Sequence, residues 1–292
     1  MPNIRTIRNR IRSVSNTAKV TRAMEMIAAS KMRRAQQRLL AGRPYSETIA
    51  GVMKNLAGQT LDDDSDFHPL MARREVKRIG IIHITPDRGL CGGLNANVNR
   101  SLGTFVLENS VPVSVVAAGR KGRDFSVRNS LDVRAVFIDM GDAPSLLDTV
   151  PIAKSAIEDY TNGYVDEVYV SYSRFVSTVV QRPVIEKILP VDARDLEGEA
   201  DQAATGGDYI YEPSPIDVLA LLLPRFVEMQ VYHAILESIG SEQSARMVAM
   251  SGATDSASEM IQDLTLLMNK VRQASITTEL LDIVGGVAAL EG

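Results

Sequence analysis

The sequence predicts an α/β protein in which a long antiparallel coiled coil, formed by the N- and C-terminal helices, carries an inserted Rossmann-like α/β domain. Two observations lead to this prediction. Apolar residues recur at steps of three and four at both ends of the 292-residue chain, as in a coiled-coil seam. Between the two ends, short apolar runs alternate with helical stretches. We therefore expect residues 1–60 and 209–292 to form one rod, and residues 61–208 to form the inserted domain.

The N-terminal helix is predicted from a stripe of apolar and small residues that lasts about five heptads. No glycine or proline precedes Gly42 and Pro44. A helix of roughly 55 residues would be about 80 Å long at about 1.5 Å per residue, and it needs a partner along its seam. The stripe consists of Ile4, Ile7, Ile11, Val14, Ala18, Thr21, Met24, Ala28, Met32, Ala35 and Leu39.

The middle of the chain has the pattern of a mainly parallel sheet with helices between its strands. Its expected boundaries are the acidic stretch 62–66 and the glycine-rich stretch 204–208. The predicted helices cover residues 93–109, 119–130 and 144–162. The predicted strands cover residues 76–85, 111–118, 133–138, 166–172 and 180–189.

The C-terminal helix is predicted from a second stripe of the same period, which runs from Leu219 to Val271. Ser214 before Pro215 fits an N-cap followed by proline at the first helical position. Pro224 and Gly252 are expected to bend or weaken the helix locally. This helix is the longer of the two, so its apolar end should project beyond its partner and be enclosed by another chain.

Few residues offer chemistry of their own. One cysteine, Cys91, cannot form an internal disulfide or a four-cysteine zinc site, and the histidines have no metal-binding spacing. No apolar run is expected to span a membrane. The sequence therefore predicts no catalytic, cofactor-binding or metal-binding residues. Buried hydrogen bonding is the favoured interpretation of His83 and His233.

The glycine-rich turn 87–95 follows a predicted strand and precedes a helix, where phosphate can bind. Its spacing fits neither GxxxxGK[ST] nor GxGxxG. The favoured interpretation is a tight turn that needs positive φ. Nucleotide binding, and a small α/β enzyme that uses Cys91 as its nucleophile, stay open as weaker alternatives.

Charge is distributed unevenly along the chain. Residues 1–43 hold eleven basic residues and one acidic residue, a net charge of +10, whereas the remaining residues carry −14. This asymmetry indicates an anionic partner for the first helix. Nucleic acid and an acidic protein surface both fit, and charge alone does not separate them.

Several blocks of sequence resemble the γ subunits of F-type ATP synthase, in the family's order. They are residues 11–35 (IRSVSNTAKVTRAMEMIAASKMRRA), 87–95 (DRGLCGGLN), 209–213 (YIYEP), 241–250 (SEQSARMVAM), 253–255 (ATD) and 269–277 (NKVRQASIT). The resemblance implies a central rotor shaft, not itself an enzyme. It would couple proton-driven rotation of the membrane c ring to conformational changes at the catalytic β subunits, for ATP synthesis.

The same resemblance implies partners and site residues. The partners would be a ring of three α and three β subunits, the ε subunit and the c ring, at the cytoplasmic face of a bacterial membrane. Membrane contact would be indirect, through the c ring, and no nucleic acid would bind. Met24, Arg246, Gln273 and Thr277 would contact the α/β ring and couple torque, whereas Tyr209, Tyr211 and Glu212 would contact ε and the c ring at the foot. The alternative function is a basic coiled-coil protein that binds nucleic acid.

Overall fold

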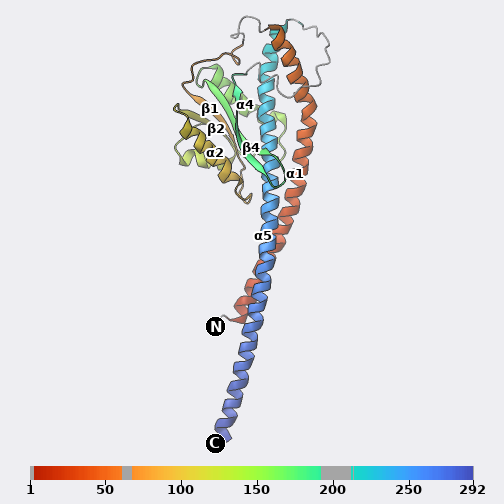
Figure 1. Cartoon of the computed structure of the whole chain (residues 1–292), viewed down its shortest axis with the longest axis vertical. Helices are drawn as coiled ribbons and strands as arrows, with labels where there is room; N and C mark the ends of the chain where they lie inside the picture. The colour runs from red at the N-terminus through yellow and green to blue at the C-terminus, as the bar shows by residue number, and fades with distance from the viewer. Residues whose placement is uncertain (1–2, 61–67, 192–211, 213, 292) are drawn as a thin grey trace. The chain divides into compact units, whose positions relative to one another are not determined.

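The computed structural model describes residues 3–60, 68–191, 212 and 214–291 (Figure 1). They form two compact units, residues 1–28 with 247–292 and residues 29–246. The helices are α1 (Ile4–Thr60), α2 (Leu94–Glu108), α3 (Arg120–Arg128), α4 (Leu146–Thr161) and α5 (Pro215–Glu291). The strands are β1 (Ile79–Ile84), β2 (Val113–Ala118), β3 (Asp132–Phe137), β4 (Glu167–Phe175) and β5 (Gln181–Leu189).

The larger unit, residues 29–246, is built around one five-stranded sheet with the order β3-β2-β1-β4-β5. Strands β1 to β4 are parallel to their neighbours, and β5 runs antiparallel to β4. The prediction of a mainly parallel sheet is therefore confirmed. Because parallel strands share a direction, the loops after β1, β2, β3 and β4 meet at one edge of the sheet.

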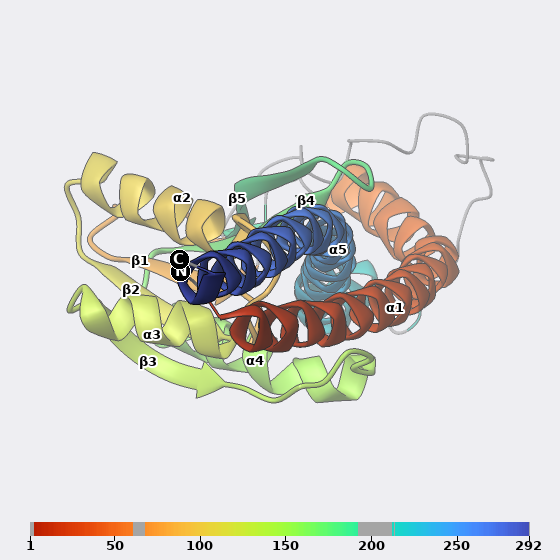
Figure 2. The same ribbon diagram turned by 90° about the horizontal axis from the view of Figure 1, so that it is seen from below.

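Alternating residues of the strands face two different sets of helices. Ile82, Ile84 and Val116 face α4 and the parts of α1 and α5 in this unit, together with Met53 and Leu223. The neighbouring residues Ile79, Ile81 and Val115 face α2 and α3, which lie beside each other against the sheet (Figure 2). The sheet is thus covered on both faces, as its apolar strands require.

In the smaller unit, residues 1–28 and 247–292, α1 and α5 pair along the predicted seam. Ile7, Ala28, Met250 and Ala257 are buried in it. Side-chain exposure then rises toward the end of α5. Ile276 to Val287 includes six large apolar side chains that are at least half exposed, namely Ile276, Leu280, Leu281, Ile283, Val284 and Val287.

The long helix α5 starts as predicted, because the Ser214 hydroxyl accepts a hydrogen bond from the Asp217 backbone N–H at 3.2 Å. It then runs through Pro224 and Gly252 without interruption, and the expected local bend or weakening at these two residues stays a prediction. Leu223 and Val227, which flank the proline, are both fully buried. Their packing offsets the backbone hydrogen bond that proline removes.

The composition of this helix bears on the expectation that no apolar run spans a membrane, which stays a prediction. Between Asp217 and Val287, α5 contains an 18-residue window with mean hydropathy 1.3, apolar enough by length and composition to cross a membrane. Within the structure 44% of that window is buried, and the core helix of a folded protein has the same character. The apolar content of α5 is used in part for packing inside the chain.

The predicted division into a rod (1–60 and 209–292) and an inserted domain (61–208) stays a prediction. Both expected boundaries, 62–66 and 204–208, lie outside the described residues.

Candidate functional site

The carboxyl edge of the sheet is where a doubly wound fold places a ligand, so it is the first candidate site. Asp87, in the loop after β1, occupies the centre of this edge. Its carboxylate accepts hydrogen bonds from the Arg120 backbone N–H after β2 and from the Asp139 backbone N–H after β3, both at 2.8 Å. One side chain of the protein therefore ties three strand ends together.

The backbone around these loops is closely packed. Gly119, between β2 and α3, has φ +121°, and a Cβ atom there would lie 1.8 Å from the Thr85 carbonyl oxygen. In the turn 87–95, Leu90 and Gly92 have φ of 64° and 58°. The interpretation of this segment as a tight turn that needs positive φ is confirmed.

Cys91 lies buried within that turn, with 1% of its surface exposed. Its thiol accepts a hydrogen bond from the Asn95 side-chain amide at 3.3 Å. Burial raises the pKa of the Cys91 thiol, and the nearby Glu242 carboxylate raises it further. A buried thiol with a raised pKa is a poor nucleophile, because the thiolate is the reactive form.

Helix α5 meets the same edge through an ion pair. Arg246 donates to the Glu242 carboxylate at 2.7 Å and to the Gly89 carbonyl oxygen at 3.2 Å. Both charged side chains are largely buried, with 11% and 15% exposed. Burial raises the pKa of the Glu242 carboxyl, whereas Arg246 lowers it. The pair therefore contacts the glycine-rich turn and holds α5 against it.

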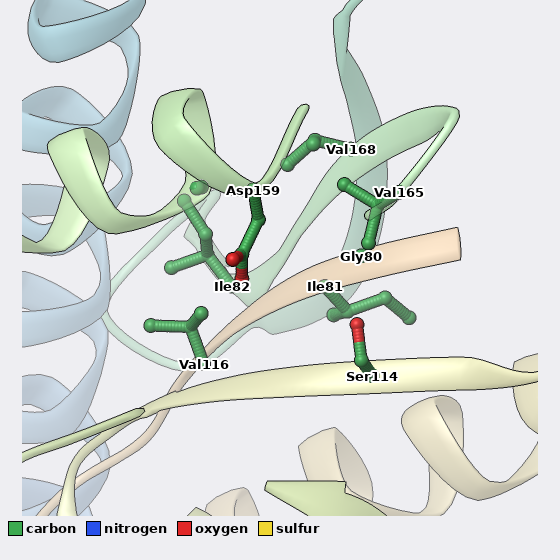
Figure 3. A pocket seen from close by; sticks show the side chains of 9 residues that line it. Gly80, Ile81, Ile82, Ser114, Val116, Asp159, Val165 and Val168 are labelled. Atoms are coloured by element: carbon green, nitrogen blue, oxygen red, sulfur yellow. The ribbon is translucent and has the colours of Figure 1, made fainter. Parts of the chain in front are cut away.

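Two spaces in the described part of the larger unit bear on ligand binding. A small cavity of about 10 Å³, about the size of one water molecule, lies between α4, β1, β2 and β4. Its lining is mostly aliphatic, and Figure 3 shows Asp159 reaching toward β1 from α4. An open depression of about 480 Å³ lies between α2 and β5. Neither includes a residue of the turn 87–95.

His83 is confirmed as a hydrogen-bonded core histidine. Its ring nitrogens lie 3.1 Å from the Ser171 hydroxyl and 2.9 Å from the Asn99 side-chain oxygen. Burial lowers the pKa of His83 to about 4, and the hydrogen bond to Asn99 opposes this shift. The neutral ring is therefore a fixed link between β1, β4 and α2. Among the described residues, no group of acidic, histidine and cysteine side chains has the arrangement of a metal site.

The residues expected to couple torque fall in both units. Gln273 and Thr277 are exposed on α5, one turn apart, and the Thr277 hydroxyl donates to the Gln273 carbonyl oxygen at 3.0 Å. Met24 is half-buried on α1 in the same unit. Arg246 belongs to the larger unit and makes the internal contacts given above. The ring-contact roles of all four stay predictions.

Of the three expected foot residues, the structure describes one. Glu212 is exposed. Tyr209 and Tyr211 lie outside the described residues. The contact of this segment with ε and the c ring stays a prediction.

Sequence reasoning missed a set of polar residues that fasten α5 to the sheet. They are buried or form salt bridges, and they are Lys31, Asp142, Ser241, Gln243 and Ser244. One signal could have found them. Gln243 occupies a position of the apolar stripe, where a polar side chain needs a partner.

Taken together, two long terminal helices that pair with each other and a closely packed α/β sheet inserted between them define a stalk-type structural subunit. Comparison with known proteins identifies the stalk. A family model described as ATP synthase matches residues 3–290. The chain is 58% identical to an ATP synthase gamma chain of Dehalococcoides mccartyi over 290 residues, covering 99% of this chain and all of that protein. It is 47% identical to an ATP synthase gamma chain of Chloroflexus aurantiacus over 293 residues, covering 99% of each.

Solved structures share the fold. A chain of the Euglena gracilis mitochondrial ATP synthase, in a structure of its OSCP, F1 and c-ring, matches with a TM-score of 0.66 at 21% identity, over 98% of this chain and 94% of that one. The chain belongs to the ATP synthase gamma chain family and is the central rotor stalk of an F-type ATP synthase. It is a non-catalytic subunit, since the catalytic sites of the complex lie on the β subunits.

Proposed function

We propose that the chain turns inside a ring of three α and three β subunits and transmits proton-driven rotation of a c ring to the catalytic β subunits. The single observation that carries this proposal is the exposed apolar stretch of α5. Six large side chains between Ile276 and Val287 are at least half exposed. An apolar surface of this kind is typical of a contact with another protein.

The positive charge of α1 supports an acidic protein surface on the ring that would surround the shaft. Arg8, Arg12, Lys19 and Arg22 are exposed along the helix. Acidic loops of the β subunits would complement them. The alternative of a nucleic-acid-binding coiled coil is set aside, because the chain belongs to the ATP synthase gamma chain family.

Physically, such a shaft acts only through differences in contact. Three chemically identical β subunits take different conformations only if the shaft contacts each of them differently. We assign ring contact and torque coupling to Met24, Arg246, Gln273 and Thr277. Gln273 and Thr277 suit the role because they are exposed on neighbouring turns.

The foot of the stalk is assigned to Tyr209, Tyr211 and Glu212, against the ε subunit and the c ring. The chain would then be a peripheral protein at the cytoplasmic face of a bacterial membrane, and its membrane contact would run through the c ring. Replacing Tyr211 and Glu212 with alanine should leave ATP hydrolysis by the soluble complex intact. It should abolish ATP-driven proton pumping in inverted membrane vesicles.

Reconstitution tests the proposal as a whole. The purified chain should show no ATPase activity, and mixing it with α and β subunits should give a 3:3:1 complex that hydrolyses ATP. In that complex, the double variant Gln273→Ala with Thr277→Ala should lower the stall torque, whereas Ser256→Ala, an exposed hydroxyl on the same helix, should not. A chain that stays monomeric in the presence of α and β would refute the assignment.

A further inference from the structure

A short segment of α5, Ser241 to Arg246, makes directional contacts with the sheet edge. The Ser241 hydroxyl donates to the Ser173 carbonyl oxygen at 2.8 Å, and the Ser244 hydroxyl donates to the Thr178 carbonyl oxygen at 2.6 Å. Both serines are fully buried. Their acceptors lie at the end of β4 and in the turn that leads to β5. This side of the helix is therefore fastened to the β4–β5 hairpin.

The opposite side of the same two turns is fastened to other loops. The Gln243 amide donates to the Asp142 carboxylate at 3.0 Å, and Arg246 donates to the Gly89 carbonyl oxygen at 3.2 Å. At about 100° per residue, the pair Gln243 and Arg246 points roughly 200° away from the pair Ser241 and Ser244. The loops after β1, β3 and β4 thus hold α5 from two opposite sides.

Asp142 extends this arrangement to the other long helix. Its second carboxylate oxygen accepts from the Lys31 ammonium of α1 at 2.6 Å. One carboxylate therefore joins both shaft helices to the loop after β3. All of these residues belong to the larger unit.

The position of Asp142 is itself fixed by the backbone. Asp139 and Gly141 have φ of 58° and 78°. The left-handed conformation is unfavourable for Asp139, and it is held because the Asp139 N–H donates to Asp87.

We propose that Ser241 to Arg246, together with Asp142 and Lys31, form a torsional clamp that fixes the angular position of α5 and α1 against the α/β sheet. The close packing of the apolar side chains of α5 resists rotation of the helix, and directional polar contacts add to that resistance. Buried hydrogen bonds depend steeply on angle, and a rotation that breaks them leaves buried groups without partners. In a rotor stalk, torque tends to turn the paired helices against the sheet, which is the motion that the clamp resists. Asp142 is a positioning residue in this proposal.

The test measures angular stiffness in the assembled complex. The chain is assembled with α, β and ε subunits, the ring is immobilised, and a gold rod is attached to a cysteine introduced at Leu107, which is 86% exposed on α2. The angular variance of the rod is recorded without nucleotide. Native Cys91 is buried and does not compete for the label.

Asp142→Ala removes two of the five bonds named above, those to Lys31 and Gln243. For equal springs acting in parallel the variance scales inversely with stiffness, so we expect it to rise by a factor of about 1.7. Ser241→Ala with Ser244→Ala should produce a similar rise. Asp142→Asn keeps an acceptor for Gln243 but loses the charge that pairs with Lys31. Its angular variance should therefore lie between that of the parent and that of Asp142→Ala. Asp142→Glu should restore much of the stiffness.

Matched controls separate a clamp from a general loosening of the fold. Glu108→Gln and Ser110→Ala change an exposed carboxylate and an exposed hydroxyl away from the clamp, and they should leave the variance unchanged. Asp142 is 45% exposed, so Asp142→Ala should melt within a few degrees of the parent chain. A parental variance in Asp142→Ala and in the serine double variant, with melting unchanged, would overturn the proposal. An equal rise in the two controls would overturn it as well.

Discussion

Helix α5 behaves in two different ways along its length. In the larger unit, around Leu223 to Gln243, most of its side chains are buried, and Ser241 and Gln243 have hydrogen-bond partners within the chain. In the smaller unit, beyond Gln273, nearly every side chain is exposed and many are apolar. One continuous helix therefore contains a part that is completed by its own chain and a part that another protein must complete.

The difference shows that helix formation and helix burial are separate requirements. Both parts are helical, and Gly285 and Gly286 do not end the exposed one. The buried part packs against α1 and the sheet, whereas the exposed part relies on local propensity and on a partner. Sensitivity to substitution should therefore change along α5, from large in the buried part to small in the exposed part.

The largest contrast is expected between two leucines of the same helix. Leu223 is fully buried in the core of the larger unit, whereas Leu280 is 57% exposed. Leu223→Ala should lower the free energy of unfolding by about 2–5 kcal/mol, because it removes packed atoms and leaves a cavity. Leu280→Ala should change it by no more than about 0.5 kcal/mol. Urea unfolding followed by hydrogen exchange gives both values, and equal losses would contradict the division of α5 into two parts.

The second contrast is between the responses of the two units to pH. All three histidines of the sequence lie in the larger unit. The pKa of His83 falls from 6.5 in the unfolded chain to about 4 in the folded one. The unfolded state therefore binds the proton more readily, and folding stability is complete above pH 6.5 and is lost as the pH falls toward 4. The loss should reach about 3 kcal/mol.

This pH effect should be local. The protection of the β1 and α2 amides, measured as the exchange rate relative to the intrinsic rate at the same pH, should fall as the pH drops from 6.5 to 4, with a smaller change at the seam near Thr21. In His83→Gln, the amide replaces the imidazole and does not titrate, so the acid sensitivity of β1 should shrink. Parent-like sensitivity in that variant would show that other groups are responsible.

Much of the fold could be predicted from the sequence, because the spacing at which apolar residues recur differs between helices and strands. The strand predicted over residues 111–118 is β2 (Val113–Ala118), and the helix predicted over 144–162 is α4 (Leu146–Thr161). Helix α5 continues through Pro224, as the unbroken stripe predicts, because tertiary packing overrides the low propensity of proline within a helix. The pairing of the N- and C-terminal helices could be predicted because each has a long apolar stripe and neither stripe has another partner in the sequence.

The clamp could not be predicted, for a physical reason. Its acceptors at Ser173, Thr178 and Gly89 are backbone carbonyl oxygens, which every residue carries, so the sequence does not mark them. Which carbonyl meets which side chain depends on loops whose shape includes positive φ at Leu90 and Asp139. Neither residue is a glycine, and a sequence offers little sign of such a conformation.

The third contrast lies inside the seam of the smaller unit. The hydroxyls of Thr21 and Thr254 lie 2.7 Å apart in a buried position, within an otherwise apolar stripe. Replacing either one with valine should destabilise the pairing by about 1–2 kcal/mol, because the remaining hydroxyl loses a buried partner. The double variant Thr21→Val with Thr254→Val should be closer to the parent than either single variant. Additive losses in this double-mutant cycle would mean that the two hydroxyls do not interact.

The only gain in stability is expected at Gly252. No other atom lies within 4 Å of the position that its Cβ would occupy, whereas a Cβ at Gly119 would lie 1.8 Å from the Thr85 carbonyl oxygen. Gly252→Ala should therefore stabilise α5 by about 1 kcal/mol through helix propensity alone. Gly119→Ala should destabilise the larger unit, since its φ of +121° and the close approach both require glycine. Thermal melting of the two variants checks the signs. A loss of stability in Gly252→Ala would show that this stretch of the smaller unit is packed as tightly as the sheet edge, and that the contrast along α5 begins farther toward its end.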